Sequence, residues 1–476
     1  MRTEPYFIQI GFDFGTSFCK CVCRDVIKGT SAWVHIPNRS TNAELPFLVP
    51  STIQYRSGKF SPISDSEKLY AKDALPLLKM AMEKVALDKL DDPCLKPFGV
   101  AAGSFSKEVL RDFVETASVY LLASVLGGVL RSIRQKENFK DFGSLPNDYA
   151  AVNMAIPVAN AQNKKVAEMF LKSLQISWVL AEQIADAPKI EIEELKTLIR
   201  SATASAKFEK VHKACSVYPE VSANLQVFAH SRSASPGYYL FTDTGAGTVD
   251  QCLFEFIRND DRKHGVLYFP KRSWSEIDRL VVKYANSGQP YLQYLAAAVA
   301  PLGSSHIERR AAQLSKSDSK EPLSGDYERW RLLKESGEKH PTLLEAKEGI
   351  LRELEIETNA CRQAAARKFL NIRSAKSVRL VFGGGGHCTN PYERAVKSSF
   401  EKETNEKLLQ AFGGSPEVVG VPPPPDLKLE RSKSSWLRRL TVAYGLSYPE
   451  ASLTNFTYPN DLPDVDGSLR KGNRRQ

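Results

Sequence analysis

Two segments far apart in the chain, residues 10–17 and 240–250, repeat one pattern of residue types. In each, an apolar strand ends at an aspartate, Asp13 or Asp243, and a turn rich in glycine and threonine precedes a second apolar strand. Such a turn carries little side-chain bulk, so its backbone N–H groups can approach phosphate oxygens. An aspartate at the strand end can hold the water shell of a magnesium ion. Two such hairpins facing each other would hold a nucleoside triphosphate from both sides.

A single glycine-rich turn between strands is usually only a tight hairpin. Here several further segments occur in one order, and together they resemble the actin/hexokinase/heat-shock ATPase superfamily, most closely the DnaK-like chaperone ATPase domain. The resemblance covers most of residues 6–448. The matched segments are residues 11–17 and 243–250 (two phosphate loops), 50–53, 151–157, 218–224 (a connecting segment), 302–308, 383–386 (an adenosine loop) and 442–445 (a closing helix).

The resemblance implies an α/β chain with a two-lobed, actin-like ATPase fold of duplicated ribonuclease-H-like domains. Residues 1–237 would form lobe I, with the first phosphate loop and the connecting helix. Residues 238–448 would form lobe II, with the second phosphate loop, a helical insertion at about 271–345 and the adenosine loop. Residues 449–476 would be a basic, poorly ordered tail. Strand–turn–strand units followed by helices occur twice, which also favours two similar α/β domains with a cleft between them.

By the same resemblance, the chain would bind Mg²⁺ and ATP or ADP, and water would attack the γ-phosphate. Catalysis would come mainly from positioning and charge neutralisation. Asp13 and Asp243 would order the water shell of the magnesium ion, Glu220 would help to place the metal or the attacking water, and Thr248 would contact phosphate. The other residues expected to contact the nucleotide are Gly15, Thr16, Ser17, Gly245, Ala246, Gly247, Gly303, Ser304, Lys334, Gly384, Gly385, Gly386 and His387.

The sequence departs from the DnaK-like pattern in three places. Aligning Ala74 with the family's alanine leaves Leu75 where a γ-phosphate-contacting lysine belongs, although Lys72 is close, so we expect slow hydrolysis. The second loop carries Ala246 in place of a glycine. Only residues 449–476 follow the last matched helix, so a peptide-binding domain of the DnaK kind is not expected.

The function predicted by the resemblance is a slow ATPase that acts as a nucleotide-controlled, chaperone-like switch for an unidentified protein partner. That partner would bind the polar stretch at 315–341 or the outer faces of the lobes. One alternative is an actin-like, filament-forming ATPase of the plasmid-segregation or cell-shape type, with head-to-tail self-assembly. A small-molecule kinase and a nucleotide-binding pseudo-enzyme are further alternatives.

The composition is ordinary for a soluble globular protein, the length predicts two or more domains, and we expect a cytoplasmic location. The net charge of +10 over 476 residues permits contact with nucleic acid but does not imply it. No signal segment opens the chain, and the apolar run at 119–129 is shorter than the roughly 20 residues of a membrane span. Cys19, Cys21 and Cys23 alternate on one strand face, too far apart for a zinc site, and are expected to be reduced packing thiols.

Hydrophobic periodicity indicates the elements that must position these residues. Strands are predicted as a pair within 5–25 and at 33–36, 52–55, 149–156 and 377–382, with a second hairpin from Tyr238. Helices are predicted at 70–90, 107–137, 161–174, 191–211, 221–228, 341–370 and 436–447.

Overall fold

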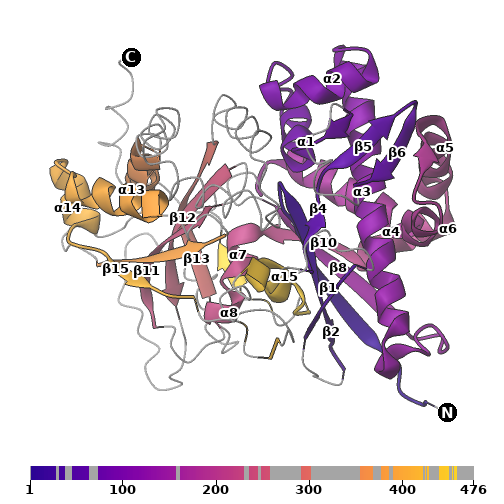
Figure 1. Cartoon of the computed structure of the whole chain (residues 1–476). Coiled ribbons are helices and arrows are strands. Elements are labelled where there is room, and N and C mark those ends of the chain that lie inside the picture. The colour runs from indigo at the N-terminus through magenta and orange to yellow at the C-terminus, as the bar shows by residue number, and fades with distance from the viewer. Residues whose placement is uncertain are drawn as a thin grey trace.

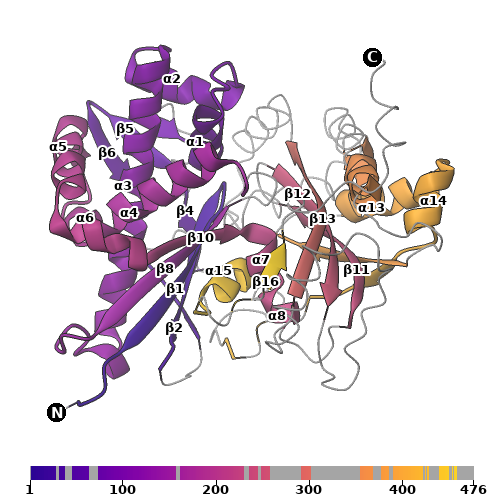
Figure 2. The same ribbon diagram turned by 180° about the vertical axis from the view of Figure 1, so that it is seen from behind.

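The computed structural model describes a mixed α/β chain whose two larger sheets lie in different halves of the molecule (Figure 1). Figure 2 shows the same arrangement from behind, with strands β1, β2, β8 and β10 in one half and β11, β12 and β13 in the other. The described residues are 2–27, 32–37, 46–63, 73–156, 161–229, 235–244, 248–257, 291–301, 354–356, 358–367, 377–384, 390–421, 424, 426–427, 439–449, 453 and 455–457.

The first sheet is built around strand β1, which pairs antiparallel with β2 and parallel with β8. Strand β10 extends the sheet beyond β8 in the same direction, and β3 and β4 pair antiparallel with β2. Every residue of β1 after its first is buried, as a near-continuous apolar run predicts for a strand covered on both faces. The strands are β1 (Phe7–Phe14), β2 (Phe18–Asp25), β3 (Trp33–Val34), β4 (Val49–Pro50), β8 (Tyr149–Ile156) and β10 (Cys215–Pro219).

The second sheet repeats this strand order and these strand directions. Strand β11 takes the place of β1, pairing antiparallel with β12 and parallel with β14. Strand β13 follows β12 antiparallel, β15 follows β14 in parallel, and β16 adds an outer strand beside β13. The strands are β11 (Gly237–Thr244), β12 (Thr248–Ile257), β13 (Tyr291–Pro301), β14 (Val378–Gly383), β15 (Glu417–Val419) and β16 (Asn455–Thr457).

Strand β13 corrects the sequence prediction of a helical insertion at about 271–345. Residues 291–301 are rich in alanine, which favours a helix locally, but they complete the edge of β12 and are therefore extended. The rest of that stretch lies outside the described residues.

A third, smaller sheet, in the order β7–β5–β6–β9, packs with the long helices α3 and α4. Helix α3 begins after Ser106, whose side chain accepts a hydrogen bond from the Val109 N–H. It approaches α4 closely at Gly127, where a Cβ would lie 2.1 Å from the Ala181 carbonyl oxygen. The elements are β5 (Ile53–Arg56), β6 (Lys59–Pro62), β7 (Ala74–Leu75), β9 (Ile190–Glu191), α3 (Lys107–Gln135) and α4 (Lys164–Asp186).

Most of the predicted elements are present, with shifted ends. The helix expected at 70–90 begins only at Leu78, because Pro76 disfavours helical backbone at Leu75, which belongs to β7. The helix expected at 191–211 divides at Ser205, which caps α6. The remaining helices are α1 (Leu78–Ala86), α2 (Lys96–Ala102), α5 (Ile192–Thr203), α6 (Ala206–Lys210), α7 (Glu220–Asn224), α8 (Gln226–Ala229), α13 (Asn390–Glu401), α14 (Glu406–Phe412) and α15 (Thr441–Leu446), with helical turns at 354–356 and 358–367 and 3-10 turns at Pro93–Leu95, Glu137–Phe139 and Val211–Lys213.

Helices α7 and α15 lie between the two larger sheets in both ribbon views (Figures 1 and 2). Two glycines allow α15 to sit there. A Cβ at Gly11 of β1 would lie 1.9 Å from the Ala443 carbonyl oxygen, and a Cβ at Gly445 would lie 1.9 Å from the Ala223 carbonyl oxygen. Helix α15 is therefore in backbone contact with both the first strand of the chain and α7.

Among the described residues, one helix is long and apolar enough to cross a membrane, namely α3. Its most apolar window is 83% buried inside the fold, which is how the core helix of a soluble protein behaves. The apolar run at 119–129 is shorter than a membrane span, but the whole of helix α3 is long enough to be one.

The seven cysteines of the described residues are buried, and none of them forms a disulfide there. Burial raises the pKa of the Cys19 and Cys23 thiols to about 12, so both stay protonated at neutral pH. This is consistent with the prediction of packing thiols on β2.

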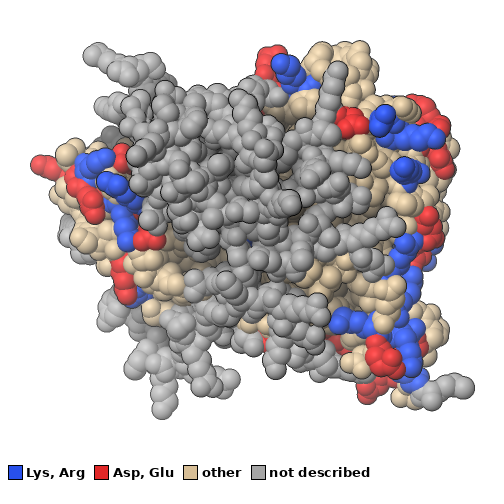
Figure 3. Space-filling view, in the orientation of Figure 1, with Lys and Arg blue, Asp and Glu red and all other residues tan. Residues whose placement is uncertain are grey.

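Charges of both signs are interspersed on the described part of the face that Figure 3 shows. In Figure 3, blue and red side chains alternate along the edge of the half that contains α5 and α6. That part of the face therefore carries no broad field of one sign.

Candidate functional site

The two hairpins, β1–β2 and β11–β12, have the same register. In the first, Asp13 lies opposite Lys20, and the residues that close the turn are Phe14 and Cys19. In the second, Asp243 lies opposite Asp250, and Thr244 and Val249 close the turn. Asp13 and Asp243 thus occupy equivalent places, each a buried aspartate that is the next-to-last residue of the first strand of its hairpin.

The first turn is held by backbone and hydroxyl contacts. Ser51 lies fully buried beside it, donating a hydrogen bond from Oγ to the Gly15 carbonyl oxygen at 2.7 Å and one from its backbone N–H to the Ser17 carbonyl oxygen at 2.8 Å. Gly15 is required by close approach, because a Cβ there would lie 2.4 Å from the Phe18 carbonyl oxygen. The backbone around Thr16, itself 8% exposed, is therefore fixed next to Asp13.

Three carboxylates from different elements lie close to one another. Asp13 is the next-to-last residue of β1 and is 2% exposed, Asp243 is the next-to-last residue of β11 and is 5% exposed, and Glu220 is the first residue of α7. Burial, followed by the negative charges of Glu220 and Asp13, raises the pKa of Asp243 to about 7. The surroundings of Asp243 therefore favour its protonated form.

Two ammonium groups partly balance these acids. Lys20 forms an ion pair with Asp13, and Lys79 of α1 forms one with Glu220 at 3.0 Å between Nζ and Oε2. Lys79 is only 7% exposed. Burial disfavours its charged form, but the nearby carboxylates of Glu220 and Asp13 outweigh that effect and raise its pKa. We call Asp13, Lys20, Lys79, Glu220 and Asp243 the charged cluster.

Asn224 connects Asp243 to the helix between the sheets. Its Nδ2 donates to Asp243 Oδ2 at 3.1 Å, and its Oδ1 accepts from the Thr441 hydroxyl of α15 at 2.7 Å. Gly383 of β14 leaves room for this contact, because a Cβ there would lie 2.7 Å from Asn224 Nδ2. Gly384 follows with φ of 76°, a backbone conformation that favours glycine.

The charged cluster fits a water-coordinated divalent cation better than a directly ligated one. Within the part of the chain that the structure describes, no group of three or more His, Cys, Asp or Glu side chains has the geometry to ligate a metal. However, Asp13 Oδ1 is buried without a hydrogen-bond partner, and carboxylates exceed ammonium groups in the cluster. Magnesium commonly keeps several waters, and waters on Asp13 and Asp243 would satisfy both features.

The structure brings together part of the residue set predicted from the sequence. Asp13, Glu220 and Asp243 gather in the charged cluster, Gly15, Thr16 and Ser17 form the turn beside Asp13, and Gly384 follows the residue that pairs with Asp243. Thr248 begins β12, but its side chain is not described. The other predicted contacts lie outside the described residues: Gly245, Ala246, Gly247, Gly303, Ser304, Lys334, Gly385, Gly386 and His387.

Sequence reasoning missed Lys79, Lys20 and Asn224. Lys79 follows Leu78 at the start of an amphipathic helix, where a lysine is normally solvated, so nothing local marks it as buried. Lys20 could have been found, because the hairpin register that closes at Phe14 and Cys19 pairs it with Asp13. Asn224 was included only as the end of the matched segment 218–224.

A scan against models of known protein families finds no match to this chain, and a search of curated proteins finds no significant relative. The resemblance described above consequently rests on its short sequence segments alone.

Proposed function

We propose that this chain binds Mg·ATP between its two larger sheets and hydrolyses it slowly, as a two-lobed ATPase of the actin/heat-shock type. The observation that carries the proposal is the repeated hairpin: two sheets of one strand order each place a buried aspartate next to last in the first strand of a hairpin with the same register. Strand order, strand directions and hairpin register all agree with a duplicated ribonuclease-H-like domain. A single glycine-rich turn would not carry this argument.

Four residues of the charged cluster have a role in this proposal, namely Asp13, Lys79, Glu220 and Asp243. The bound magnesium would supply positive charge to the phosphate oxygens. Asp13 and Asp243 accept hydrogen bonds from ordered water, and backbone N–H groups of the turn at Gly15–Phe18 donate to phosphate. Glu220 orients a water molecule through its carboxylate.

We assign to Lys79 the role of the lysine that the DnaK-like pattern expects near Leu75. Its ammonium group forms an ion pair with Glu220 and is near Asp13, so it would be available to neutralise negative charge on a transferred phosphoryl group. It comes from the first turn of α1 rather than from the segment around Lys72 and Leu75. Hydrolysis would be slow, because Lys79 must leave or share its carboxylate partner to contact phosphate.

Helices α7 and α15 offer a route from nucleotide to partner surface. Asp243 contacts Asn224 of α7, which contacts Thr441 of α15, and α15 also packs against β1. Nucleotide contacts that change Asp243 would bias this chain of hydrogen bonds and the relative position of the sheets. The proposal is therefore a cytoplasmic, nucleotide-controlled switch with a protein partner.

The test is magnesium-dependent ATP binding by titration calorimetry, with phosphate release measured on the same samples. Asp243→Ala should lose magnesium-dependent binding. Lys79→Met should keep binding within about tenfold and lose turnover by about 10²-fold, the effect typical of removing one charge-stabilising group. Lys59→Met is the matched control, since Lys59 pairs with Glu191 on the exposed edge of the small sheet.

Because Lys79→Met leaves Glu220 buried without its partner, the double variant Lys79→Met/Glu220→Gln controls for folding. Binding without turnover in the unmodified protein would indicate a nucleotide-sensing pseudo-enzyme. Absence of ATP binding would refute the proposal, and nucleotide-dependent pelleting of the protein would favour the filament-forming alternative.

A further inference from the structure

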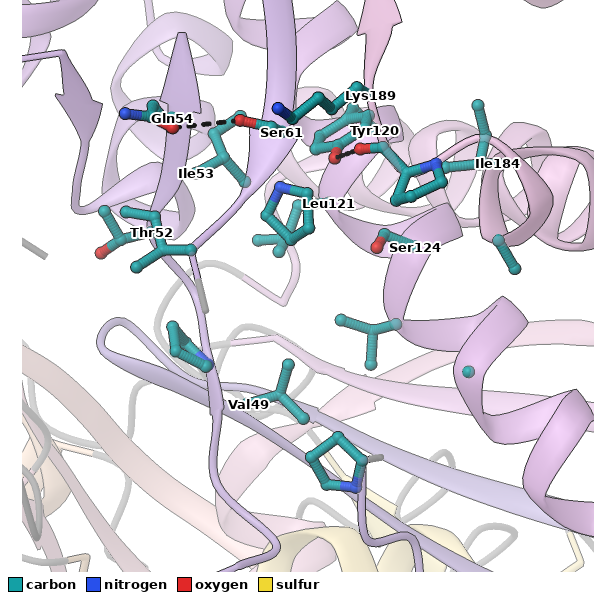
Figure 4. A pocket seen from close by; sticks show the side chains of 18 of the residues that line it. Val49, Thr52, Ile53, Gln54, Ser61, Tyr120, Leu121, Ser124, Ile184 and Lys189 are labelled. Carbon is teal, nitrogen blue, oxygen red and sulfur yellow. Dashed lines mark hydrogen bonds between the residues drawn. The ribbon is translucent and has the colours of Figure 1, made fainter. Parts of the chain in front are cut away.

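A separate cavity of about 540 Å³ lies between the small sheet and helices α3 and α4, and none of its lining residues belongs to the charged cluster. Figure 4 shows Thr52, Ile53 and Gln54 on one side of it, with Tyr120 and Ser124 of α3 and Ile184 of α4 on the other. Its volume lies within the range of about 300–1,000 Å³ that is typical of small-molecule sites. Size alone therefore allows an organic ligand.

The buried imidazole of His35 presents a hydrogen-bond acceptor at this cavity. Ser132 Oγ donates to the Val129 carbonyl oxygen at 2.8 Å, so it must accept from His35 Nδ1, which lies 3.0 Å away. Burial lowers the pKa of His35 to about 4, so the ring is neutral and Nε2 carries a lone pair. The position of Nε2 is fixed beside Gly128 of α3, where a Cβ would lie 3.5 Å from it.

Some of the other polar groups of the wall already form hydrogen bonds within the protein, whereas others are available to contact a ligand. Figure 4 shows the Ser61 hydroxyl donating to Gln54 Oε1, and the Tyr120 hydroxyl donating to the Pro188 carbonyl oxygen. Among the described residues, no hydrogen bond engages the Ser124 hydroxyl, and no carboxylate pairs with Lys189 at the wall.

The rest of the wall is mainly aliphatic. Ile53 and Ile63 come from the small-sheet side, and Leu121, Val125 and Ile184 come from the helices. A ligand that matches this wall has an apolar body, a neutral N–H or O–H group for His35 Nε2, and an acidic group for Lys189.

We propose that this cavity binds a small, largely apolar organic anion that donates one hydrogen bond to His35 Nε2 and places its acidic group at Lys189. The site is distinct from the nucleotide site and does not depend on it. It is built from the small sheet and from α3 and α4, whose buried residues belong to one hydrophobic core.

The probe pair 8-anilinonaphthalene-1-sulfonate and N-phenyl-1-naphthylamine tests both polar contacts by fluorescence titration. Both have the aromatic body and the N–H donor, but only the first carries an anion. We expect saturable binding of both at micromolar concentration in the full chain. Lys189→Met should weaken the sulfonate at least fivefold and change the neutral probe less than twofold, whereas His35→Leu should weaken both.

Gly128→Leu is the variant designed to fill the cavity. A Cβ at Gly128 meets only His35 atoms at 3.5 Å or more, so the longer side chain enters the cavity, and replacing a glycine inside a helix favours the helix. We expect it to weaken both probes at least tenfold. Ser124→Leu, one helical turn earlier on α3, fills the same space from a second point.

Gly128→Ala is the matched control and should keep binding within threefold. Circular dichroism and urea unfolding establish that each variant is folded. Absence of saturable binding to the unmodified protein would overturn the proposal. So would unchanged binding in both folded cavity-filling variants, because the probes would then occupy another surface.

Discussion

The substitution Asp243→Asn should stabilise the nucleotide-free protein at neutral pH while removing its response to Mg·ATP. The Asp243 carboxyl is 5% exposed, and burial together with the charges of Glu220 and Asp13 raises its pKa to about 7 in the folded state. In the unfolded chain the group has its ordinary pKa of 3.8. Asparagine cannot ionise, yet its carbonyl oxygen can still accept the hydrogen bond from Asn224 Nδ2.

The direction of the stability change depends on whether the folded or the unfolded state binds the Asp243 proton more tightly. The folded state holds the Asp243 proton up to higher pH, so this stabilising contribution is complete below about pH 4 and is lost as pH rises through about 7. The difference between the two pKa values corresponds to an upper limit of about 4 kcal/mol, since one unit is about 1.4 kcal/mol. We expect the variant to exceed the unmodified protein by roughly 2–4 kcal/mol at pH 8 and to equal it near pH 4.

Urea unfolding without nucleotide, at several pH values between 4 and 8, measures this difference. Repeating the series with Mg·ATP should reverse the order at pH 8, because only the unmodified protein gains free energy from the ligand. Asp148→Asn is a control for which we expect the opposite change in stability. Hydrogen bonding from Arg2 lowers the pKa of Asp148, so this variant should be less stable at pH 8. Equal stability of Asp243→Asn and the unmodified protein at pH 8 would refute the reasoning.

Three further outcomes are expected. Gly445→Ala should lower the free energy of unfolding by at least about 2 kcal/mol, measured by urea unfolding, because the new Cβ would collide with the Ala223 carbonyl oxygen of α7. Gly420→Ala, with open space around it, is the steric control, and equal losses would contradict this. Ser51→Ala should lower the free energy of unfolding by about 1 kcal/mol and weaken ATP binding measured by calorimetry, because the turn at Gly15 loses its hydroxyl contact. A gain in ATP affinity would disprove this expectation. The three thiols on β2 should react with Ellman's reagent only when urea unfolds the chain, because burial keeps them protonated and covered; rapid labelling of the native protein would show otherwise.

Local sequence patterns predicted the helices and strands whose conformation depends mainly on their own residues. The strand at 149–156 and the helix beginning at Lys107 have clear periodicity and a cap, and both were placed correctly. Residues 291–301 were misassigned because their strand conformation depends on β12, far away in the chain. Strand β10 was not predicted, because Cys215–Pro219 is short and gains its structure from β8.

In the candidate site, too, residues marked by local sequence were predicted, and residues buried through long-range packing were not. Asp13, Asp243 and Glu220 stand at ends of elements, where composition and order reveal them. Lys79 could not be found in this way, since its burial results from α1 packing near α7 and not from any local signal. The sequence thus predicted the carboxylates of the charged cluster, whereas Lys79 becomes part of the cluster only through the tertiary fold.

The position of α15 has a consequence for synthesis on the ribosome. Gly11 in the first strand fits against the Ala443 carbonyl oxygen, and Asn153 Nδ2 donates to the carbonyl oxygens of Leu446 and Tyr448. At about 5–20 residues per second, α15 emerges roughly 20–90 s after the strand it covers. During that interval the nascent first sheet has one face without its final covering, so this protein should itself need a holding chaperone until α15 is made.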